Sequence, residues 1–441
     1  MRNDTHSTER TRTPPRGAVT HQGTISWGTY GCAANQADSE MMKGLLKEAG
    51  FEFTTSRQDA DVIVINTCTV KEATFHRMLH KIQEVVNAGK PLLVAGCMPK
   101  TERSAIEKIA PYASLIGPNS THKIVHAVSE TLTGKKSVQL QEVPFPKVGL
   151  PRIRKNDVIA ICPIATGCLG HCSFCQTKLA KGDLLSYPLP LILDEVKASL
   201  QNGCKEIWLT AQDTGCYGFD LGTDLSILLT KIVKIPEEFF VRVGMMNPQH
   251  VLPILDDLLD SYESDKIFKF LHLPVQSGSN RILKRMNRNY HVSDVHQIIR
   301  KFKDAFEYLT LSTDIIVGFP GETHSDFQLT LNLIKGIKPD IVNISKFGKR
   351  AGTEAAKMSQ VPKPIISERI KKLVELCKRT QLENNEKWIG WKGKVLLDKK
   401  GKRMGVIGRN FAYKPILTRG SLGSFKAVQV LQARPTFLIG E

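Results

Sequence analysis

Three cysteines lie close together at the spacing C-x3-C-x2-C, namely Cys168, Cys172 and Cys175. Thiolates in such a group bind zinc or an iron–sulfur cluster. A zinc finger would usually supply a second pair of ligands to complete a tetrahedron, and no such pair follows nearby. Three cysteines on a four-iron cluster leave one iron open, which is a catalytic arrangement. The spacing therefore favours a catalytic cluster, and the alternative is a structural zinc site or a buried group of cysteines.

A second group of cysteines is dispersed, but each member directly follows a predicted strand: Cys32, Cys68 and Cys97. The carboxyl ends of parallel strands share one edge of a sheet, and ligands bind at that edge. A single free cysteine is more often a small buried side chain. Three at the same position relative to their strands indicate convergence on one point, so we expect a second iron–sulfur cluster with an open iron.

Four cysteines remain, and we interpret them as core or incidental residues: Cys162, Cys204, Cys216 and Cys377. Of these, Cys216 follows a predicted strand end from which it can approach the first triad, but we do not count it as a ligand.

The segment that must position the dispersed cysteines spans residues 23–135. Short apolar strands alternate there with amphipathic helices, which is typical of a doubly wound parallel sheet covered on both faces. The predicted strands lie at 24–27, 62–65 and 92–95. We expect a disordered tail at 1–22 and a proline-containing linker at 136–154.

The compact cysteine group lies in a second segment, residues 155–383. Six strand–helix units predict an incomplete (β/α)6 barrel, with strands near 158–161, 206–209, 239–243, 267–271, 310–317 and 341–345. Residues 384–441 change to short strands between glycine and Lys/Arg turns, which indicates a small antiparallel β-barrel of the OB-like kind.

The active site of such a (β/α) barrel lies at the carboxyl ends of its strands. Residues that follow the predicted strands are therefore candidates for binding a cofactor: Gln212, Asp213, Asn247, Gln276, Ser277, Gly318 and Glu322. We add Phe174, an aromatic residue inside the first cysteine group. The alternative is that each is a turn or capping residue, which is ordinary at such positions.

The net charge of the 441 residues is +18, from 61 Lys/Arg and 43 Asp/Glu, and it suggests a polyanionic partner. Half of it lies between Glu386 and Glu441, where 12 Lys/Arg face three Asp/Glu. Charged and aromatic residues interleave there in a way that suits phosphate contacts and base stacking: Lys399, Lys400, Lys402, Arg403, Arg409, Phe411 and Tyr413. The alternative is a solvated charged rim.

The polar first residues exclude a secretory signal, and no apolar run approaches the roughly 18 to 20 residues that cross a bilayer. We therefore expect a monomeric cytoplasmic protein with no membrane partner, in reducing surroundings where ten cysteines stay out of disulfides.

These motifs resemble the radical S-adenosylmethionine (SAM) methylthiotransferases. The C-x3-C-x2-C group matches the radical SAM signature, and the dispersed cysteines lie in Tyr30-Gly31-Cys32, Asn66-Thr67-Cys68 and Ala95-Gly96-Cys97. The C-terminal barrel is similar to the family's RNA-binding TRAM domain. The stretches 151–156, 177–182 and 207–215 resemble the archaeal and eukaryotic branch, which acts on tRNA carrying N6-threonylcarbamoyladenosine at position 37.

The resemblance implies two [4Fe–4S] clusters. The cluster of Cys168, Cys172 and Cys175 would bind SAM and generate the 5′-deoxyadenosyl radical that activates C2 of the adenine. The auxiliary cluster of the dispersed triad would carry the sulfur, and a second SAM would supply the methyl group. Gln212, Asp213, Gln276 and Ser277 would hold the ribose and methionine parts of SAM. The implied partners are the tRNA anticodon loop and a small electron-donor protein.

One departure from the family is Ala351 in Lys349-Arg350-Ala351-Gly352-Thr353, where a proline is usual, and it puts the turn at Arg350 in question. Three other functions stay open: methylthiolation of another tRNA adenosine, methylthiolation of a ribosomal protein side chain, and RNA binding without catalysis.

Overall fold

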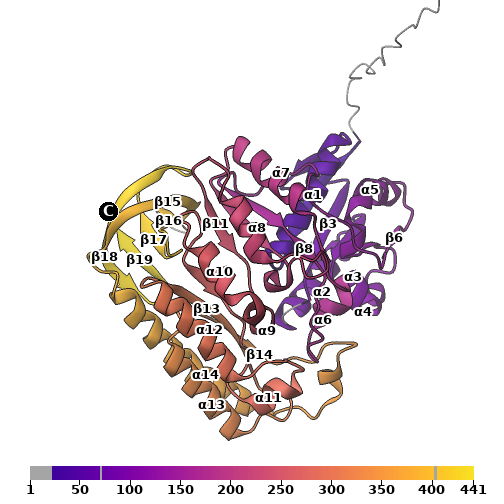
Figure 1. Cartoon of the computed structure of the whole chain (residues 1–441). Coiled ribbons are helices and arrows are strands. Elements are labelled where there is room, and N and C mark those ends of the chain that lie inside the picture. The colour runs from indigo at the N-terminus through magenta and orange to yellow at the C-terminus, as the bar shows by residue number, and fades with distance from the viewer. Residues whose placement is uncertain (1–21, 70–71, 402–404) are drawn as a thin grey trace, which may run out of the picture.

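The computed structural model describes residues 22–69, 72–401 and 405–441, which form an N-terminal α/β layer, a central curved α/β barrel and a C-terminal β-barrel (Figure 1). The tail predicted at 1–22 lies outside the described residues except for Gln22, and so do Lys402 and Arg403. Across the described ranges, every helix is too short or too polar to span a membrane.

The N-terminal layer is a six-stranded, fully parallel sheet with the strand order β2-β1-β3-β4-β5-β6. Its strands are β1 (Thr24–Thr29), β2 (Glu52–Thr54), β3 (Val62–Thr67), β4 (Leu92–Gly96), β5 (Ser114–Ile116) and β6 (Val138–Gln139). The three strands predicted from the sequence are present as β1, β3 and β4, which are neighbours in the sheet. The prediction missed the short strands β2, β5 and β6.

Helices cover both faces of this sheet, as the fully apolar strands predicted. The helices are α1 (Ala33–Glu48), α2 (Glu72–Asn87), α3 (Met98–Thr101), α4 (Arg103–Ile109), the 3-10 helix η1 (Pro118–Lys123) and α5 (Ile124–Leu132). Val62 and Val64 of β3 pack with α1 and α5 on one face, and Ile63 and Ile65 pack with α2 and α4 on the other. This alternation follows from the two-residue period of a strand.

The stretch 136–154, predicted as a linker, is tied to its surroundings. Strand β6 lies within it and pairs with β5, and the Ile153 amide donates to the Glu40 carbonyl of α1. Gly44 of α1 has no room for a side chain, because a Cβ would lie 2.2 Å from the Pro151 oxygen. The N-terminal and central parts are therefore closely packed at this junction.

The central part is the incomplete (β/α)6 barrel that the sequence predicted. Its parallel strands are β7 (Ile159–Pro163), β10 (Glu206–Thr210), β11 (Phe240–Val243), β12 (Phe270–His272), β13 (Thr310–Val317) and β14 (Ile341–Lys346). They form two three-stranded groups, which a parallel bridge between Val241 and Ile267 joins. After β7, the short strands β8 (Ala165–Thr166) and β9 (Leu185–Ser186) pair antiparallel, with residues 167–184 between them.

The helices of the central part are α6 (Gln176–Lys181), α7 (Leu189–Gln201), α8 (Leu225–Ile232), α9 (Pro248–Val251), α10 (Leu255–Tyr262), α11 (Asn280–Arg285), α12 (Val292–Ala305), α13 (His324–Ile337) and α14 (Lys363–Glu386), with 3-10 turns at Thr214–Cys216 (η2), Leu252–Ile254 (η3) and Glu354–Lys357 (η4).

The C-terminal part is a closed five-stranded barrel with the order β15-β16-β17-β19-β18. Its strands are β15 (Lys392–Lys400), β16 (Val406–Arg409), β17 (Pro415–Thr418), β18 (Phe425–Arg434) and β19 (Phe437–Gly440). The sequence prediction missed β19, and its description of the barrel as antiparallel needs correction, because β17 and β19 pair in parallel. Strand directions cannot alternate around a closed ring of five, so one parallel pair is unavoidable.

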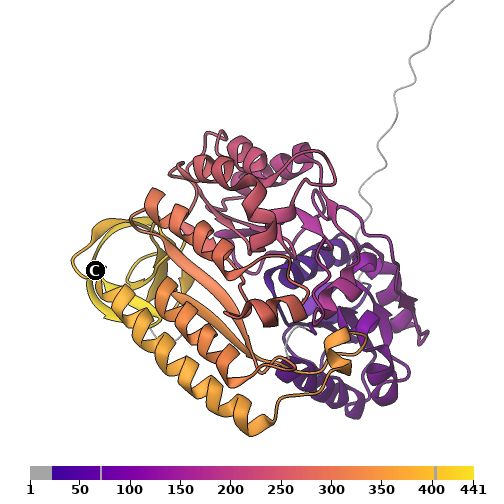
Figure 2. The same cartoon turned by 60° about the horizontal axis from the view of Figure 1, so that its bottom comes forward.

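The C-terminal barrel packs against the amino ends of the central strands. The contacting apolar residues are Val158, Trp208, Phe240, Phe268 and Phe270 from the central part and Leu396, Tyr413 and Phe425 from the barrel. The N-terminal layer lies on the other side of the central part, as both views show (Figures 1 and 2). The carboxyl ends of the central strands, where active sites of this fold lie, therefore point away from the C-terminal barrel.

Candidate active site

The loop of Cys168, Cys172 and Cys175 follows β7 and lies between the paired strands β8 and β9. Gly167 before it has φ +74°, and a Cβ there would lie 1.7 Å from the Asp183 carbonyl oxygen, so only glycine fits. Ser173 is held from two directions, because its amide donates to Met286 O at 2.9 Å and its carbonyl accepts from the Ala355 amide at 2.8 Å. These contacts fix the loop against the segments that follow β12 and β14.

Hydrogen-bond donors point at the sulfur atoms of this loop. The Gly170 amide donates to Cys168 Sγ at 3.3 Å, and the half-buried Arg288 guanidinium donates to Cys172 Sγ at 3.5 Å. A hydrogen bond from Cys216 outweighs burial and lowers the pKa of Cys168 to about 7, whereas burial raises the pKa of Cys175. Donors on sulfur stabilise thiolates, so the loop has the chemistry of a site for an iron–sulfur cluster.

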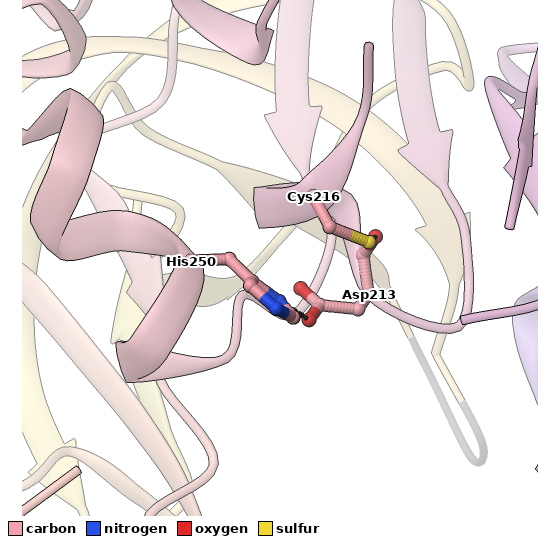
Figure 3. Close-up of side chains that lie close together, drawn as sticks. All are labelled: Asp213, Cys216 and His250. Atoms are coloured by element: carbon pink, nitrogen blue, oxygen red, sulfur yellow. Dashed lines mark hydrogen bonds and ion pairs between the residues drawn. The ribbon is translucent and has the colours of Figure 1, made fainter. Parts of the chain in front are cut away.

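Cys216 belongs to a buried group with Asp213 and His250, whose potential ligand atoms lie within 4.8 Å of one another (Figure 3). His250 Nδ1 lies 2.6 Å from Asp213 Oδ2, while Asp213 Oδ1 accepts from the amides of Gly215 and Asn247. Both carboxylate oxygens are thus engaged. The group ties the end of β10 to the end of β11 and places the Cys216 thiol beside Cys168.

Four of the residues predicted to bind the cofactor fall into two classes. Gln212 Oε1 and Asn247 Oδ1 are buried acceptors with no hydrogen-bond partner among the described residues. Unpartnered buried acceptors are costly, so these two fit a ligand that donates hydrogen bonds. Asp213 and Ser277 instead accept backbone N–H groups, from Gly215 and Ser279 respectively. They support the loops, which is the alternative that the sequence left open.

Three other predicted contacts have packing partners in the structure. A Cβ on Gly318 would lie 2.4 Å from Ile366 of α14, and the Glu322 carboxylate accepts from the Gly318 amide and pairs with Arg369 of α14 at 2.6 Å. Phe174 packs edge-on against Phe319, with ring centroids 6.3 Å apart. These contacts attach the loop after β13 to α14 and to the first triad.

Gln276 also follows β12, and its backbone is in the left-handed region with φ +73°. Its main chain bridges to Ile315 of β13. Such a conformation in a non-glycine residue costs of order 1 kcal/mol or more and is frequent at functional sites.

The dispersed triad converges at the carboxyl ends of β1, β3 and β4, as predicted. A Cβ on Gly31 would lie 2.9 Å from Cys68 Sγ, and the Cys97 amide donates to the Thr67 carbonyl. Burial and the neighbouring thiols Cys68 and Cys32 raise the pKa of Cys97 to about 12, with Lys181 opposing them. Cys32 is exposed and the other two are buried, so one side of the site is open.

Two buried asparagines hold the loops of the dispersed triad together. Asn35 Nδ2 donates to the carbonyls of Tyr30 and Thr67, and Asn66 Nδ2 donates to Asn35 O and Ser39 Oγ. Their amide oxygens have no partner among the described residues. Neither role was predicted, because the local sequence around Asn35 and Asn66 carries no sign of these hydrogen bonds.

The residues predicted to contact RNA do not form one surface. Lys399 and Lys400 are exposed on β15. Tyr413, in contrast, is 6% exposed and packs on Phe268 and Phe270 of the central part, with Arg409 stacked on its ring at 4.3 Å. This burial contradicts base stacking on Tyr413.

Arg409 and Phe411 also face protein. Arg409 Nε donates to Asp398 at 3.3 Å, and Phe411 packs among Trp388, Trp391 and Tyr308. Both residues serve the junction between the C-terminal barrel and the rest of the chain, and their contacts with protein do not support the predicted role in RNA binding.

The turn at Arg350 is held without the proline that Ala351 replaces. Both the amide and the hydroxyl of Thr353 donate to the Arg350 carbonyl. Gln176 of α6 donates to the Ala351 carbonyl and to Glu102, at the end of α3. The turn therefore joins the first triad's helix to the N-terminal layer.

Comparison with known proteins agrees with this division of the chain. Residues 24–117 match the uncharacterized protein family UPF0004, and residues 162–334 match the radical SAM superfamily. The structure resembles the radical S-adenosylmethionine methyltransferase TsrM from Kitasatospora setae, with a TM-score of 0.57 and 13% identity over 76% of this chain and 77% of that one. At this identity the likeness shows a shared fold.

Sequence relatives are much closer. A probable threonylcarbamoyladenosine tRNA methylthiotransferase from Pyrococcus horikoshii is 43% identical over 416 residues, 93% of this chain and 97% of the relative. The relative from Archaeoglobus fulgidus is 42% identical over 94% of this chain and 97% of its own length. The human threonylcarbamoyladenosine tRNA methylthiotransferase is 39% identical over 78% of this chain and 61% of its own. The chain therefore belongs to the threonylcarbamoyladenosine tRNA methylthiotransferases, a family of radical SAM enzymes.

Proposed function

We propose that this enzyme attaches a methylthio group to C2 of N6-threonylcarbamoyladenosine at position 37 of tRNA, using two [4Fe–4S] clusters. The observation that carries the proposal is the pair of cysteine triads. One follows β7 and ends at Cys175, where α6 begins, and the other closes around Cys97, where α3 begins. Helices α3 and α6 contact each other, so a substrate base can reach both triads.

The adenine C2–H bond is the reason for this arrangement. It is neither acidic nor hydridic enough for acid–base catalysis at neutral pH. A cluster with bound SAM supplies the one-electron chemistry that the side chains lack. In the proposal Cys168, Cys172 and Cys175 hold that cluster, and the free acceptors of Gln212 and Asn247 bind donors on SAM.

The second triad supplies the sulfur in this proposal. Cys32, Cys68 and Cys97 hold an auxiliary cluster, and the exposure of Cys32 beside two buried cysteines leaves that cluster open to substrate. The hydrogen bonds of Asn35 and Asn66 hold the ends of β1 and β3 to the start of α1.

The tRNA would bind along one side of the molecule. Lys399 and Lys400 lie on the C-terminal barrel, at the amino ends of the central strands, and the cysteines lie at the carboxyl ends. Strand β10 has five residues and separates the two ends by about 16 Å. RNA on the lysines would therefore reach the cysteines only if it extends well beyond the target base, as an anticodon stem with its loop does.

Mass spectrometry of tRNA nucleosides from cells with and without the gene tests the substrate. We expect the 2-methylthio derivative of N6-threonylcarbamoyladenosine to disappear when the gene is deleted. Loss of a methylthio group from another adenosine or from a ribosomal protein would show that the substrate is wrong.

Cysteine variants of the purified, reconstituted enzyme test the two roles. Cys168→Ala should abolish SAM cleavage, whereas Cys32→Ala should preserve cleavage and abolish methylthiolation. Cys377→Ala is the matched control, because this buried cysteine lies on α14, away from both triads. The wild type should hold about eight irons per chain on the four-iron assumption. Cleavage that persists in Cys168→Ala, or zinc in place of iron, would refute the proposal.

Removing the C-terminal barrel is a poor test of RNA binding, because it would expose Trp208, Phe240 and Phe268. A double Lys399→Gln, Lys400→Gln variant leaves that junction intact. It should weaken tRNA binding. The slope of log K against log[salt] should also become shallower by about 1 to 2, because two phosphate contacts are lost. Two exposed lysines of α14, changed in a Lys371→Gln, Lys378→Gln variant, provide the control. Equal salt dependence in both double variants would exclude this surface.

A further inference from the structure

A buried group of charges lies near the triad of Cys32, Cys68 and Cys97. Asp38 of α1 is flanked by two lysines, with Lys147 Nζ 2.7 Å from Oδ1 and Lys181 Nζ 3.6 Å from Oδ2. All three side chains are only 3% exposed. Charged groups are almost never buried so deeply unless they are paired, so each charge of this group needs a partner.

The group contains more positive than negative charge. Asp38 is the one carboxylate that pairs with either lysine within residues 22–69, 72–401 and 405–441. The nearby Arg152 is already paired with Glu195 at 2.9 Å. One ammonium is therefore left without a carboxylate of its own in a region that excludes water.

Lys147 and Lys181 have different partners. Lys147 has the shorter bond to Asp38 and also donates to the Pro118 carbonyl at 2.7 Å. Burial alone would lower the pKa of Lys181, but the negative charges of Asp38, Cys97, Cys32 and Cys68 raise it instead. Lys147 thus makes the shorter contact with Asp38, and Lys181 carries a charge that both Asp38 and the three cysteines stabilise.

The position of Lys181 follows from α6. This helix begins directly after Cys175, and Lys181 is its last residue. It packs on α3, which begins directly after Cys97, and the Lys181 carbonyl accepts a hydrogen bond from Asn119 of η1 at 3.4 Å. Six helical residues span about 9 Å, so α6 leads from one triad to the other.

We propose that Lys181 is a positioning residue that binds an anionic sulfur ligand, a hydrosulfide or a thiolate, at the triad of Cys32, Cys68 and Cys97. The inference rests on the proposed function, in which this triad holds a cluster that carries sulfur. The sulfur to be transferred is an anion before it is attached, and the unmatched ammonium provides an attraction that a neutral side chain would not. The sulfur site is then complete only when the helix of the first triad is docked.

The experiment uses the full chain with Cys168→Ala, Cys172→Ala and Cys175→Ala, so that only the dispersed triad can hold a cluster. After anaerobic reconstitution, iron is counted and sodium hydrosulfide is titrated while the electron paramagnetic resonance signal of the reduced cluster is recorded. This parent is compared with versions that also carry Lys181→Met, Lys181→Arg or Lys100→Met. Lys100 lies on α3 and pairs with Glu142, so its loss tests for an unspecific effect of charge.

All four proteins should hold about four irons. Lys181→Met should weaken hydrosulfide binding at least about ten-fold, which is the effect of losing one charge-assisted hydrogen bond. Lys181→Arg and Lys100→Met should bind it with nearly the affinity of the parent.

Two results would overturn the inference. One is an unchanged hydrosulfide affinity in Lys181→Met. The other is a loss of iron in Lys181→Met that Lys181→Arg restores, because the charge would then serve the cluster itself. A parent that binds no iron would instead contradict the auxiliary cluster of the proposed function.

Discussion

The junction between the central part and the C-terminal barrel contains two buried carboxyl groups that we expect to share a proton. Glu206 begins β10 and Asp398 lies on β15, and both are at most 1% exposed. Glu206 Oε1 accepts from the Trp208 indole, and Asp398 Oδ2 accepts from Arg409. Their other oxygens have no partner elsewhere among the described residues, which fits one carboxylic proton held between them.

Burial, followed by the charge of Asp398, raises the pKa of Glu206 to about 8 from its ordinary 4.5. Below pH 4.5 the folded and unfolded states both hold the proton. Between pH 4.5 and about 8 the unfolded state releases it and the folded state keeps it, so the free energy of unfolding falls as the pH rises. At 1.36 kcal/mol per pH unit the limit is about 5 kcal/mol, and sharing with Asp398 reduces our expectation to about 2 kcal/mol.

A Glu206→Gln variant removes this titration and keeps a neutral hydrogen-bonding group of the same shape. Thermal unfolding of wild type and variant, measured at intervals from pH 5.5 to 8, isolates the contribution of Glu206 from that of other groups. The melting temperature of the wild type should fall by about 2 °C more than that of the variant, at about 1 °C per kcal/mol for a chain of 441 residues.

An exposed residue of the same part of the chain gives the control, because Glu237→Gln should follow the wild type at every pH. If the Glu206→Gln curve runs parallel to the wild type as well, Glu206 is ionised at neutral pH and the shared proton does not exist.

Two further substitutions test the loops around the site. Arg369→Met leaves the buried Glu322 carboxylate unpaired, so the free energy of unfolding should fall by about 3 kcal/mol in thermal unfolding. A second change, Glu322→Gln, should recover much of this loss. No recovery would mean that Arg369 acts by packing alone. Gly31→Ala places a Cβ 2.6 Å from that of Cys68, whereas Gly89→Ala, also at a positive φ of +65°, meets nothing within 4 Å. Only the first should therefore lower the bound iron, by about half, the share of one of two clusters.

The sequence was sufficient to locate both triads, because their positions depend on strand ends. Cys32, Cys68 and Cys97 each follow an apolar strand, and the shared edge of a parallel sheet brings them together whatever the rest of the chain does. The short strands β2, β5 and β6 were missed for the opposite reason. Two or three residues are too few to show a period, and only pairing with a neighbour makes them strands.

The charged residues were harder to interpret, because a charge in sequence carries no sign of its burial. Arg409 and Tyr413 have the composition of an RNA-binding surface, yet the same cation–aromatic stacking closes a protein junction. Lys181 is the reverse case, since in the sequence it is only one basic residue of the stretch 177–182 and shows no sign of a role. Its meaning depends on Asp38, 143 positions earlier, and on Lys147, which lies in the stretch predicted as a linker.

The short helix α6 has a consequence for how the two sites work together. Cys175 directly precedes this helix and Lys181 is its last residue. A single helical segment therefore sets the distance between Cys175 of the first triad and Lys181, whose charge we assign to the dispersed triad. Gln176 and Asn119 hold that segment to the N-terminal layer at both ends. A rigid segment cannot shift at one end without shifting at the other. A change that loosens α6 should therefore impair radical generation and sulfur binding together, whereas a change to a cysteine of either triad should impair one of them.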